Sequence, residues 1–240
     1  MRSLPRVPRP AAAVAALGAA CLLAVGAGAA MAAAKQVSGA TATAAATAIN
    51  LRHSDLPTLK TQANPITSQQ RQENTTLTAC IGETSPSRAL ADVQSQDFVG
   101  PDPDTLTISS ETQIQPSVAA VNNDLVAIHR PKALTCLRTS LGRALATSAP
   151  KNSTYSIAID RLSATLPGTS GVAAVRVTAT FHIKDGSKTV TVPAYIDDIG
   201  FAYGQAEISL NVISTLSPPS ATLETKLALL LIKRAHTALG

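Results

Sequence analysis

The chain has 240 residues, a formal net charge of +5 and few aromatic side chains, with no tryptophan. Arg2, Arg6 and Arg9 are among its 20 basic residues and lie ahead of an apolar N-terminal run. Without them, 17 basic residues stand against 15 acidic ones, a net charge of about +2. No later segment combines basic clusters with aromatic residues, which a nucleic-acid surface needs for phosphate neutralisation and base stacking. We therefore expect no nucleic-acid partner.

The first 34 residues have the pattern of an export signal. Three arginines precede an uncharged run of Ala, Leu, Val and Gly at residues 11–34, and small residues around Ala30 and Ala34 offer cleavage sites. A run of this length could alternatively remain as an uncleaved membrane anchor or tether, because it can span a hydrocarbon core roughly 30 Å thick. Cys21 raises a third option, a lipidated N-terminus, although no large aliphatic residue stands three positions before it. We predict a secreted or cell-envelope protein.

The remaining chain divides by composition into two parts. Residues 35–50 are rich in Ala, Thr and Ser with one charge, which predicts a flexible linker. Residues 51–240 have the length of a single domain with its own hydrophobic core.

Two cysteines, Cys80 and Cys136, follow the leader. In an oxidising compartment an even pair is a disulfide by default, and two buried free thiols are the alternative. With only two cysteines and no histidine nearby, the usual ligand spacing of a zinc site is lacking. We predict no metal site and no cofactor.

Strand patterns dominate the second half. Apolar and polar residues alternate from Val175 to Lys184, Asp185-Gly186 predicts a tight hairpin turn, and the alternation resumes from Val190 to Ile196. We expect another reversal at 197–200 and a bulge at Gly204-Gln205 within a last strand at 201–212. Two more strands are predicted at 106–114, beside 93–98, and at 155–159.

Helical patterns lie between and after these strands. Apolar residues repeat at three and four positions over 118–128, over 134–145 and over 223–235. Cys136 therefore lies on a helix. An antiparallel meander with helices covering it, an α+β fold closed by a C-terminal amphipathic helix, is the architecture that buries these one-sided elements.

Several short motifs carry a resemblance to a known family. They are Ser54-Asp55-Leu56-Pro57, Ala79-Cys80-Ile81-Gly82, Ser95-Gln96-Asp97-Phe98 and Thr135-Cys136-Leu137. Together with the meander and the closing helix, they are similar to exported actinobacterial proteins with a PsbP-like α/β sandwich, and more distantly to extracellular sensor-like domains of receptor kinases. The resemblance covers about residues 51–239 and implies a fold and an envelope location. It implies no catalytic residue, and Cys80 and Cys136 carry over as a structural bridge.

Candidate catalytic and metal-binding groups are scattered. His182 shares the polar face of its strand with Arg176 and Lys184, and the other histidines have no partner at metal-ligand spacing. The Gly168–Gly171 segment lacks the spacing of a nucleophile elbow and predicts a turn. Asp102-Pro103-Asp104 and Asp197-Asp198 offer too few oxygens for calcium, so we interpret both as solvated turns.

No nucleophile and base stand together in a recognisable pattern, so the sequence predicts an exported, non-enzymatic binding module. Its partner is an unidentified envelope ligand, lipid or protein, held in a groove between helices and sheet. Two alternatives stay open: a membrane-tethered sensor-like domain, and a secreted hydrolase with a dispersed Ser/His/Asp site.

Overall fold

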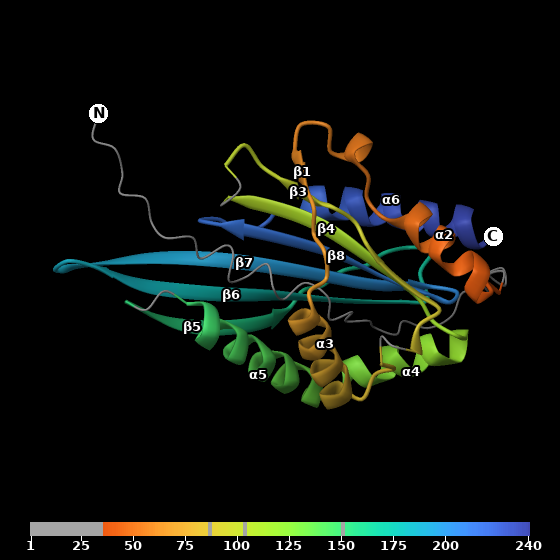
Figure 1. Cartoon of the computed structure of the whole chain (residues 1–240), viewed down its shortest axis with the longest axis horizontal. Helices are drawn as coiled ribbons and strands as arrows, with labels where there is room; N and C mark the ends of the chain where they lie inside the picture. The colour runs from red at the N-terminus through yellow and green to blue at the C-terminus, as the bar shows by residue number, and fades with distance from the viewer. Residues whose placement is uncertain (1–35, 86–87, 103–104, 150–151) are drawn as a thin grey trace.

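The computed structural model describes residues 36–85, 88–102, 105–149 and 152–240 (Figure 1). Its helices are α2 (Gly39–Ile49), the short 3₁₀ helix η2 (His53–Asp55), α3 (Ser68–Ile81), α4 (Val118–His129), α5 (Pro131–Ser148) and α6 (Ala221–Leu239). Its strands are β1 (Lys60–Gln62), β2 (Ala91–Gln94), β3 (Asp97–Val99), β4 (Leu106–Ile114), β5 (Ser153–Arg161), β6 (Gly171–Asp185), β7 (Lys188–Tyr203) and β8 (Ala206–Thr215). The α+β prediction is confirmed.

The strands form one antiparallel sheet of eight strands. Its order is β1-β3-β4-β8-β7-β6-β5, and β2 pairs with β4 beside β3. The predicted meander is β6-β7-β8, and the predicted pairing of 93–98 with 106–114 is confirmed as β2 and β3 on β4. Because strands are pleated, alternate residues of each strand share one face.

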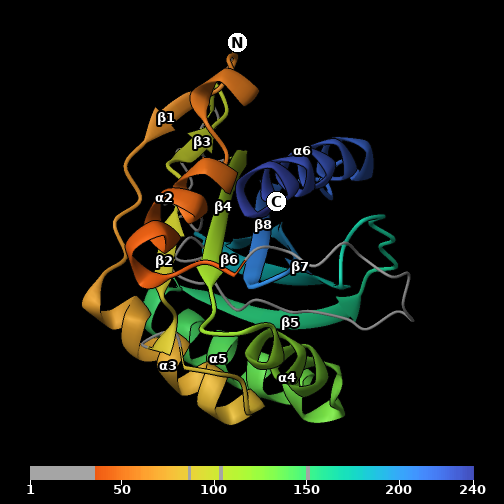
Figure 2. The same cartoon turned by 90° about the vertical axis from the view of Figure 1, so that its right-hand side faces the viewer.

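Helices cover both faces of this sheet (Figures 1 and 2). Helices α2 and α6 contact each other, and they pack on β2, β4, β7 and β8. On the other face α4 and α5 contact β6 and β5, and α3 packs against α5. The apolar side chains between these layers form one continuous core.

The predicted reversal at 197–200 is wrong, because β7 continues through these residues to Tyr203. Asp197 and Asp198 pair across the strands with Arg176 and Val175 of β6, so both aspartates lie inside the sheet and not in a solvated turn. The chain reverses instead at Gly204-Gln205, where a bulge was predicted. Gly204 has a φ of 59° there, which suits a two-residue hairpin turn.

The predicted flexible linker at 35–50 is also wrong over α2. Ala42, Ala46 and Ile49 of this helix are fully buried. The Val37 amide donates to the Gln205 side-chain oxygen at 2.7 Å, so the segment ahead of the helix is anchored too. Alanine is only weakly hydrophobic, so an alanine-rich segment does not stand out in the sequence as a buried helix. Its small side chains let α2 approach α6 and the sheet closely.

The Cys80–Cys136 disulfide joins the last turn of α3 to α5. Cys136 is buried and Cys80 packs against the same core. The predicted bridge is therefore present in the structure, and it links two helices of the layer over β5 and β6.

The Ser54–Pro57 motif has a structural role at α6. Arg234 of α6 donates from Nη1 and Nη2 to the two Asp55 carboxylate oxygens at 2.8 and 2.7 Å, and from Nη1 to the Asn50 carbonyl at 2.8 Å. Although burial of Asp55 acts in the opposite direction, these bonds hold the pKa of Asp55 below its ordinary value. The ion pair ties the end of α2 and η2 to the C-terminal helix.

Replacing Arg234 by Met is expected to lower the free energy of unfolding by about 2 kcal/mol, because it leaves the half-buried Asp55 carboxylate and the Asn50 carbonyl without their donor. Denaturant unfolding at pH 7 measures the loss. Lys233→Met, at the exposed neighbouring position, is the matched control and should have little effect. Equal stability of the two variants would show that the ion pair contributes nothing.

Candidate functional site

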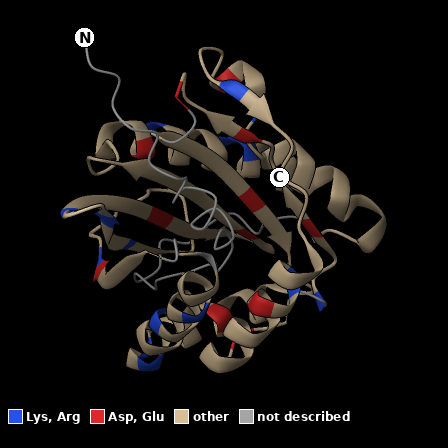
Figure 3. Cartoon of the chain, turned by 60° about the vertical axis from the view of Figure 1, so that its left-hand side comes forward, with Lys and Arg blue, Asp and Glu red and all other residues tan. Residues whose placement is uncertain are grey.

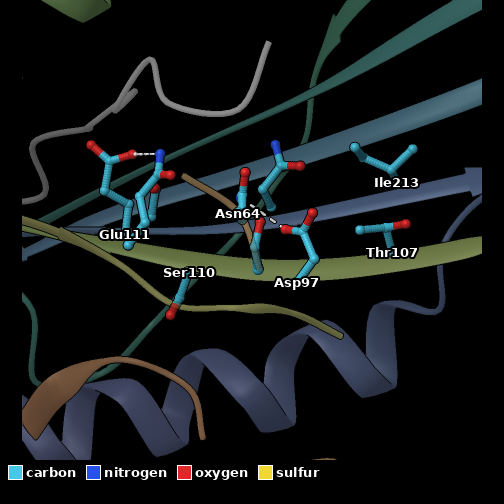
Figure 4. A pocket seen from close by; sticks show the side chains of 10 residues that line it. Asn64, Asp97, Thr107, Ser110, Glu111 and Ile213 are labelled. Atoms are coloured by element: carbon cyan, nitrogen blue, oxygen red, sulfur yellow. Dashed lines mark hydrogen bonds between the residues drawn. The ribbon is translucent and has the colours of Figure 1, made fainter. Parts of the chain in front are cut away.

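Two hollows lie on opposite faces of the sheet, and their sizes differ. The first is a polar pocket on the face away from α6 (Figure 4). Its lining consists of Asn64, Gln94, Asp97, Thr107, Ser109, Ser110, Glu111, Ser209, Asn211 and Ile213. The Ser110 side chain points away from the hollow in Figure 4, and its Oγ donates to the Asn50 side-chain oxygen at 3.0 Å.

Carboxyl groups of the polar pocket are held by amides. Asn64 Nδ2 donates to Asp97 at 2.8 Å, and Gln94 and Gln113 each donate to Glu111 at 2.8 Å. Burial raises the pKa of Asp97 to about 6, and burial together with the nearby Asp92 raises that of Glu111 to about 8. The free volume is about 20 Å³, room for a water molecule and for nothing larger. This pocket is therefore too small to be a ligand site.

The second hollow, which we call the α6 pocket, lies between the first turns of α6, strands β6 and β7, and the loop at 162–166. Its volume is about 280 Å³, near the lower end of the range for small-molecule sites. It is lined by Leu162, Ser163, Ala164, Thr165, Leu166, Ala174, Arg176, Ile199, Ala221, Glu224, Thr225 and Ala228. Most of this surface is apolar or hydroxylic, and two of the lining residues, Arg176 and Glu224, are ionisable.

Arg176 and Asp197 form an ion pair at the floor of the α6 pocket. They are cross-strand partners on β6 and β7, so their side chains leave the sheet on the same face. Arg176 donates from Nε and Nη2 to the two Asp197 oxygens, the first at 2.7 Å. Asp197 is fully buried, whereas Arg176 retains partial access from the pocket. The pair is a fixed feature of the sheet.

Glu224, in the first turn of α6, lies next to this ion pair. The residue is 3% exposed, and its Oε1 has no hydrogen-bond partner among the residues that the structure describes. Burial raises its pKa to about 8; a hydrogen bond to the Asp197 carboxyl adds to the rise and Arg176 acts against it. Such a bond between two carboxyl groups requires a proton, so Glu224 is uncharged at pH 7. The pocket then holds one cation and one anion.

Further acidic groups lie on the opposite face of the sheet, and Figure 3 shows Asp and Glu positions along its strands. Burial and the Asp197 charge raise the pKa of Asp198 to about 7. Burial and repulsion from Asp124 raise that of Glu207 well above its ordinary value, and Glu83 is shifted in the same direction. These groups have no access to the α6 pocket, and their effect is on stability.

The structure does not bring the predicted candidates for catalysis together. His182 Nδ1 lies 3.0 Å from the Thr191 hydroxyl on an exposed strand surface. His236 Nε2 lies 3.0 Å from the Gly168 carbonyl oxygen, and its ring stacks on Tyr203. Neither partner is a serine or a carboxylate. Gly168 lies in a turn, as predicted, whereas Asp104 of the predicted acidic loop lies outside the described residues.

Sequence reasoning missed Glu224 and misplaced Arg176 and Asp197. Arg176 was grouped with the polar face of its strand, and Glu224 was not singled out in the last helix. The signal that could have found them is the pairing itself: with the hairpin turn fixed near Gly186, Arg176 stands opposite Asp197. That register places opposite charges on one face.

No family model and no curated protein matches the chain. Among solved structures, the chain is similar to the extracellular domain of PknH from Mycobacterium tuberculosis, with 12% sequence identity and a TM-score of 0.44 over 85% of this chain and 98% of that one. A likeness of this strength assigns neither a family nor a function.

Two further findings concern the described residues alone. No group of three or more His, Cys, Asp or Glu side chains there is arranged to hold a metal ion. No helix in that part of the chain is both long and apolar enough to pass through a bilayer. The predicted leader at 1–34 lies outside the described residues.

Proposed function

We propose that this protein is an exported, non-enzymatic binding module and that its ligand is a small amphiphilic molecule held in the α6 pocket. The observation that carries the proposal is the Arg176–Asp197–Glu224 set at the floor of a hollow whose other walls are apolar and hydroxylic. Apolar walls with a few convergent polar groups are typical of small-molecule sites. The sequence predicted a ligand groove between helices and sheet, and we assign that role to this pocket.

The disulfide supports export, and the first anchored residue, Val37, lies after both predicted cleavage sites. Disulfides persist in oxidising compartments, and Cys80–Cys136 is one. Cleavage after Ala30 or Ala34 would leave intact the first anchored residue, Val37, and the helix that follows. If the run at 11–34 stays as an anchor, only Lys35 and Gln36 separate it from Val37, so the domain would be held at the membrane surface.

A binding role also accounts for the polar groups of the pocket better than hydrolysis does. The α6 pocket contains hydroxyl groups from Ser163, Thr165 and Thr225, but no histidine lines it. Glu224 could act as an acid, yet Asp197 is bound at both oxygens by Arg176 and is not free to act as a base. Arg176, Asp197 and Glu224 therefore offer charged and polar groups to a ligand but no pair of nucleophile and base.

The test of the proposed function is a titration with hexan-1-ol, a neutral molecule with an apolar body and one polar end. We expect saturable amide chemical-shift changes in ¹H–¹⁵N NMR spectra, concentrated on the residues that line the α6 pocket. Thr225→Phe, at the exposed rim, should fill the entrance and weaken binding at least about tenfold, a loss of about 1.4 kcal/mol.

Thr222→Phe is the matched control, because Thr222 is also exposed on the first turn of α6 but does not line the pocket. It should bind hexan-1-ol as the unmodified protein does. Shift changes scattered over the whole surface, or equal binding by both variants, would contradict the assignment of the pocket.

A further inference from the structure

An uncompensated acceptor remains in the α6 pocket. Arg176 is fully engaged with Asp197, and the buried Oε1 of Glu224 has no partner among the described residues. Buried carboxyl oxygens in folded proteins are normally hydrogen-bonded, and an exception calls for an explanation, such as a bound water, ion or ligand. With Glu224 ionised, the three side chains would carry a net charge of −1. A positively charged donor would neutralise the set in that ionised state.

We infer that the α6 pocket recognises a small molecule with an alkylammonium group, whose charged nitrogen binds the Glu224 carboxylate and whose chain lies against the apolar walls. This inference rests on the proposed function and deepens it by naming the ligand class. The walls that would contact the chain come from Leu162, Leu166 and Ile199. A carboxylate or phosphate ligand would meet Glu224 with like charge.

Recognition of this kind couples binding to proton release. The empty pocket holds Glu224 in its protonated form, and the ammonium stabilises the carboxylate. The balanced step is R–NH₃⁺ + Glu224–COOH → R–NH₃⁺···⁻OOC–Glu224 + H⁺, with the proton leaving to solvent. No bond of the ligand is made or broken. The amine keeps its own charge because its pKa lies above that of Glu224.

The groups that face Glu224 define the titration. Asp197 of β7 and Arg176 of β6 are the charged ones; Tyr195 of β7 acts on Arg176, and the loop at 162–166 contributes no titratable side chain. Arg176 and Asp197 form an ion pair with each other. Glu224 is therefore the group in the pocket whose protonation responds to the ligand.

Isothermal titration calorimetry with hexylammonium chloride tests the inference. Below pH 8 the association constant should rise about tenfold per pH unit and level off above pH 8, where Glu224 is already ionised. Titrations in buffers of different ionisation enthalpy should give close to one proton released at pH 6.5 and none at pH 9.5. Hexanoate should not bind, and hexan-1-ol should bind without this pH dependence.

Glu224→Gln is nearly isosteric and is expected to abolish the proton release and the preference for hexylammonium over hexan-1-ol. Asp198→Asn, which removes a buried carboxyl on the opposite face of β7, is the matched control and should retain both. A further arm uses Nα-acetyl-lysine N-methylamide. Binding as tight as that of hexylammonium points to a protein lysine as the source of the group, and weaker binding points to a free amine; both support alkylammonium recognition.

The outcomes separate the inference from the proposed function. If hexan-1-ol and hexylammonium bind equally at every pH, the pocket is a binding site but the ligand class is wrong. If hexanoate binds best, Arg176 recognises the ligand and the inference is overturned. If no six-carbon probe binds, both the inference and the proposed function fail.

Discussion

The free energy of unfolding is expected to fall by more than about 3 kcal/mol between pH 5 and pH 9. The cause is a set of buried carboxyl groups whose pKa values are raised in the folded protein, to about 8 for Glu111 and about 7 for Asp198, with Glu207 shifted in the same direction. Such groups hold protons in the folded state that the unfolded chain releases above about pH 4.5. Their contribution is complete below that pH and is lost as pH rises toward 8.

Denaturant unfolding at pH 5, 7 and 9 measures this dependence. Glu111→Gln is expected to flatten the curve between pH 6 and 8 and to stabilise the protein at pH 9, because the neutral amide needs no proton. Asp55 has a lowered pKa, so its contribution to the free energy of unfolding is lost as the pH falls. That loss occurs below about pH 4, outside this window. Stability that is constant or increasing from pH 5 to pH 9 would contradict the assigned burial of these groups.

Loss of the disulfide is expected to cost about 4 kcal/mol, because Cys80 and Cys136 lie 56 positions apart and the bridge restricts a long loop of the unfolded chain. The double variant Cys80→Ala/Cys136→Ala should show this loss in denaturant unfolding at pH 6. Addition of reductant provides the control: it should bring the unmodified protein to the stability of the double variant and leave the variant unchanged. A double variant within 1 kcal/mol of the oxidised protein would be inconsistent with a stabilising bridge.

The elements that sequence predicted well share a clear local pattern. The strand around Val177 alternates strictly, and the helix carrying Cys136 repeats its apolar residues at three and four positions, so the side-chain period alone fixes the type of element. The meander order and the bridge between α3 and α5 followed from short turns and from an even cysteine pair.

The elements that sequence missed depend on contacts distant in the chain. Helix α2 has small side chains with a weak apolar stripe, and its packing against α6 gives it its place in the fold. Asp197-Asp198 resembles a turn locally, but Arg176, 21 positions earlier, makes the strand continuous by pairing with the first aspartate. Glu224 resembles an ordinary acidic residue of a first helical turn, and only the sheet beneath it reveals that it is buried.

We propose that Glu224 is protonated at neutral pH and lines a ligand pocket, with its buried Oε1 lacking a donor. A ¹³C NMR titration of its side-chain carboxyl carbon tests this most directly, with Glu224→Gln identifying the resonance. We predict a midpoint near pH 8 in the free protein, as burial and Asp197 require, and a shift to lower pH with saturating hexylammonium. A midpoint near 4.5, unchanged by hexylammonium, would contradict the account.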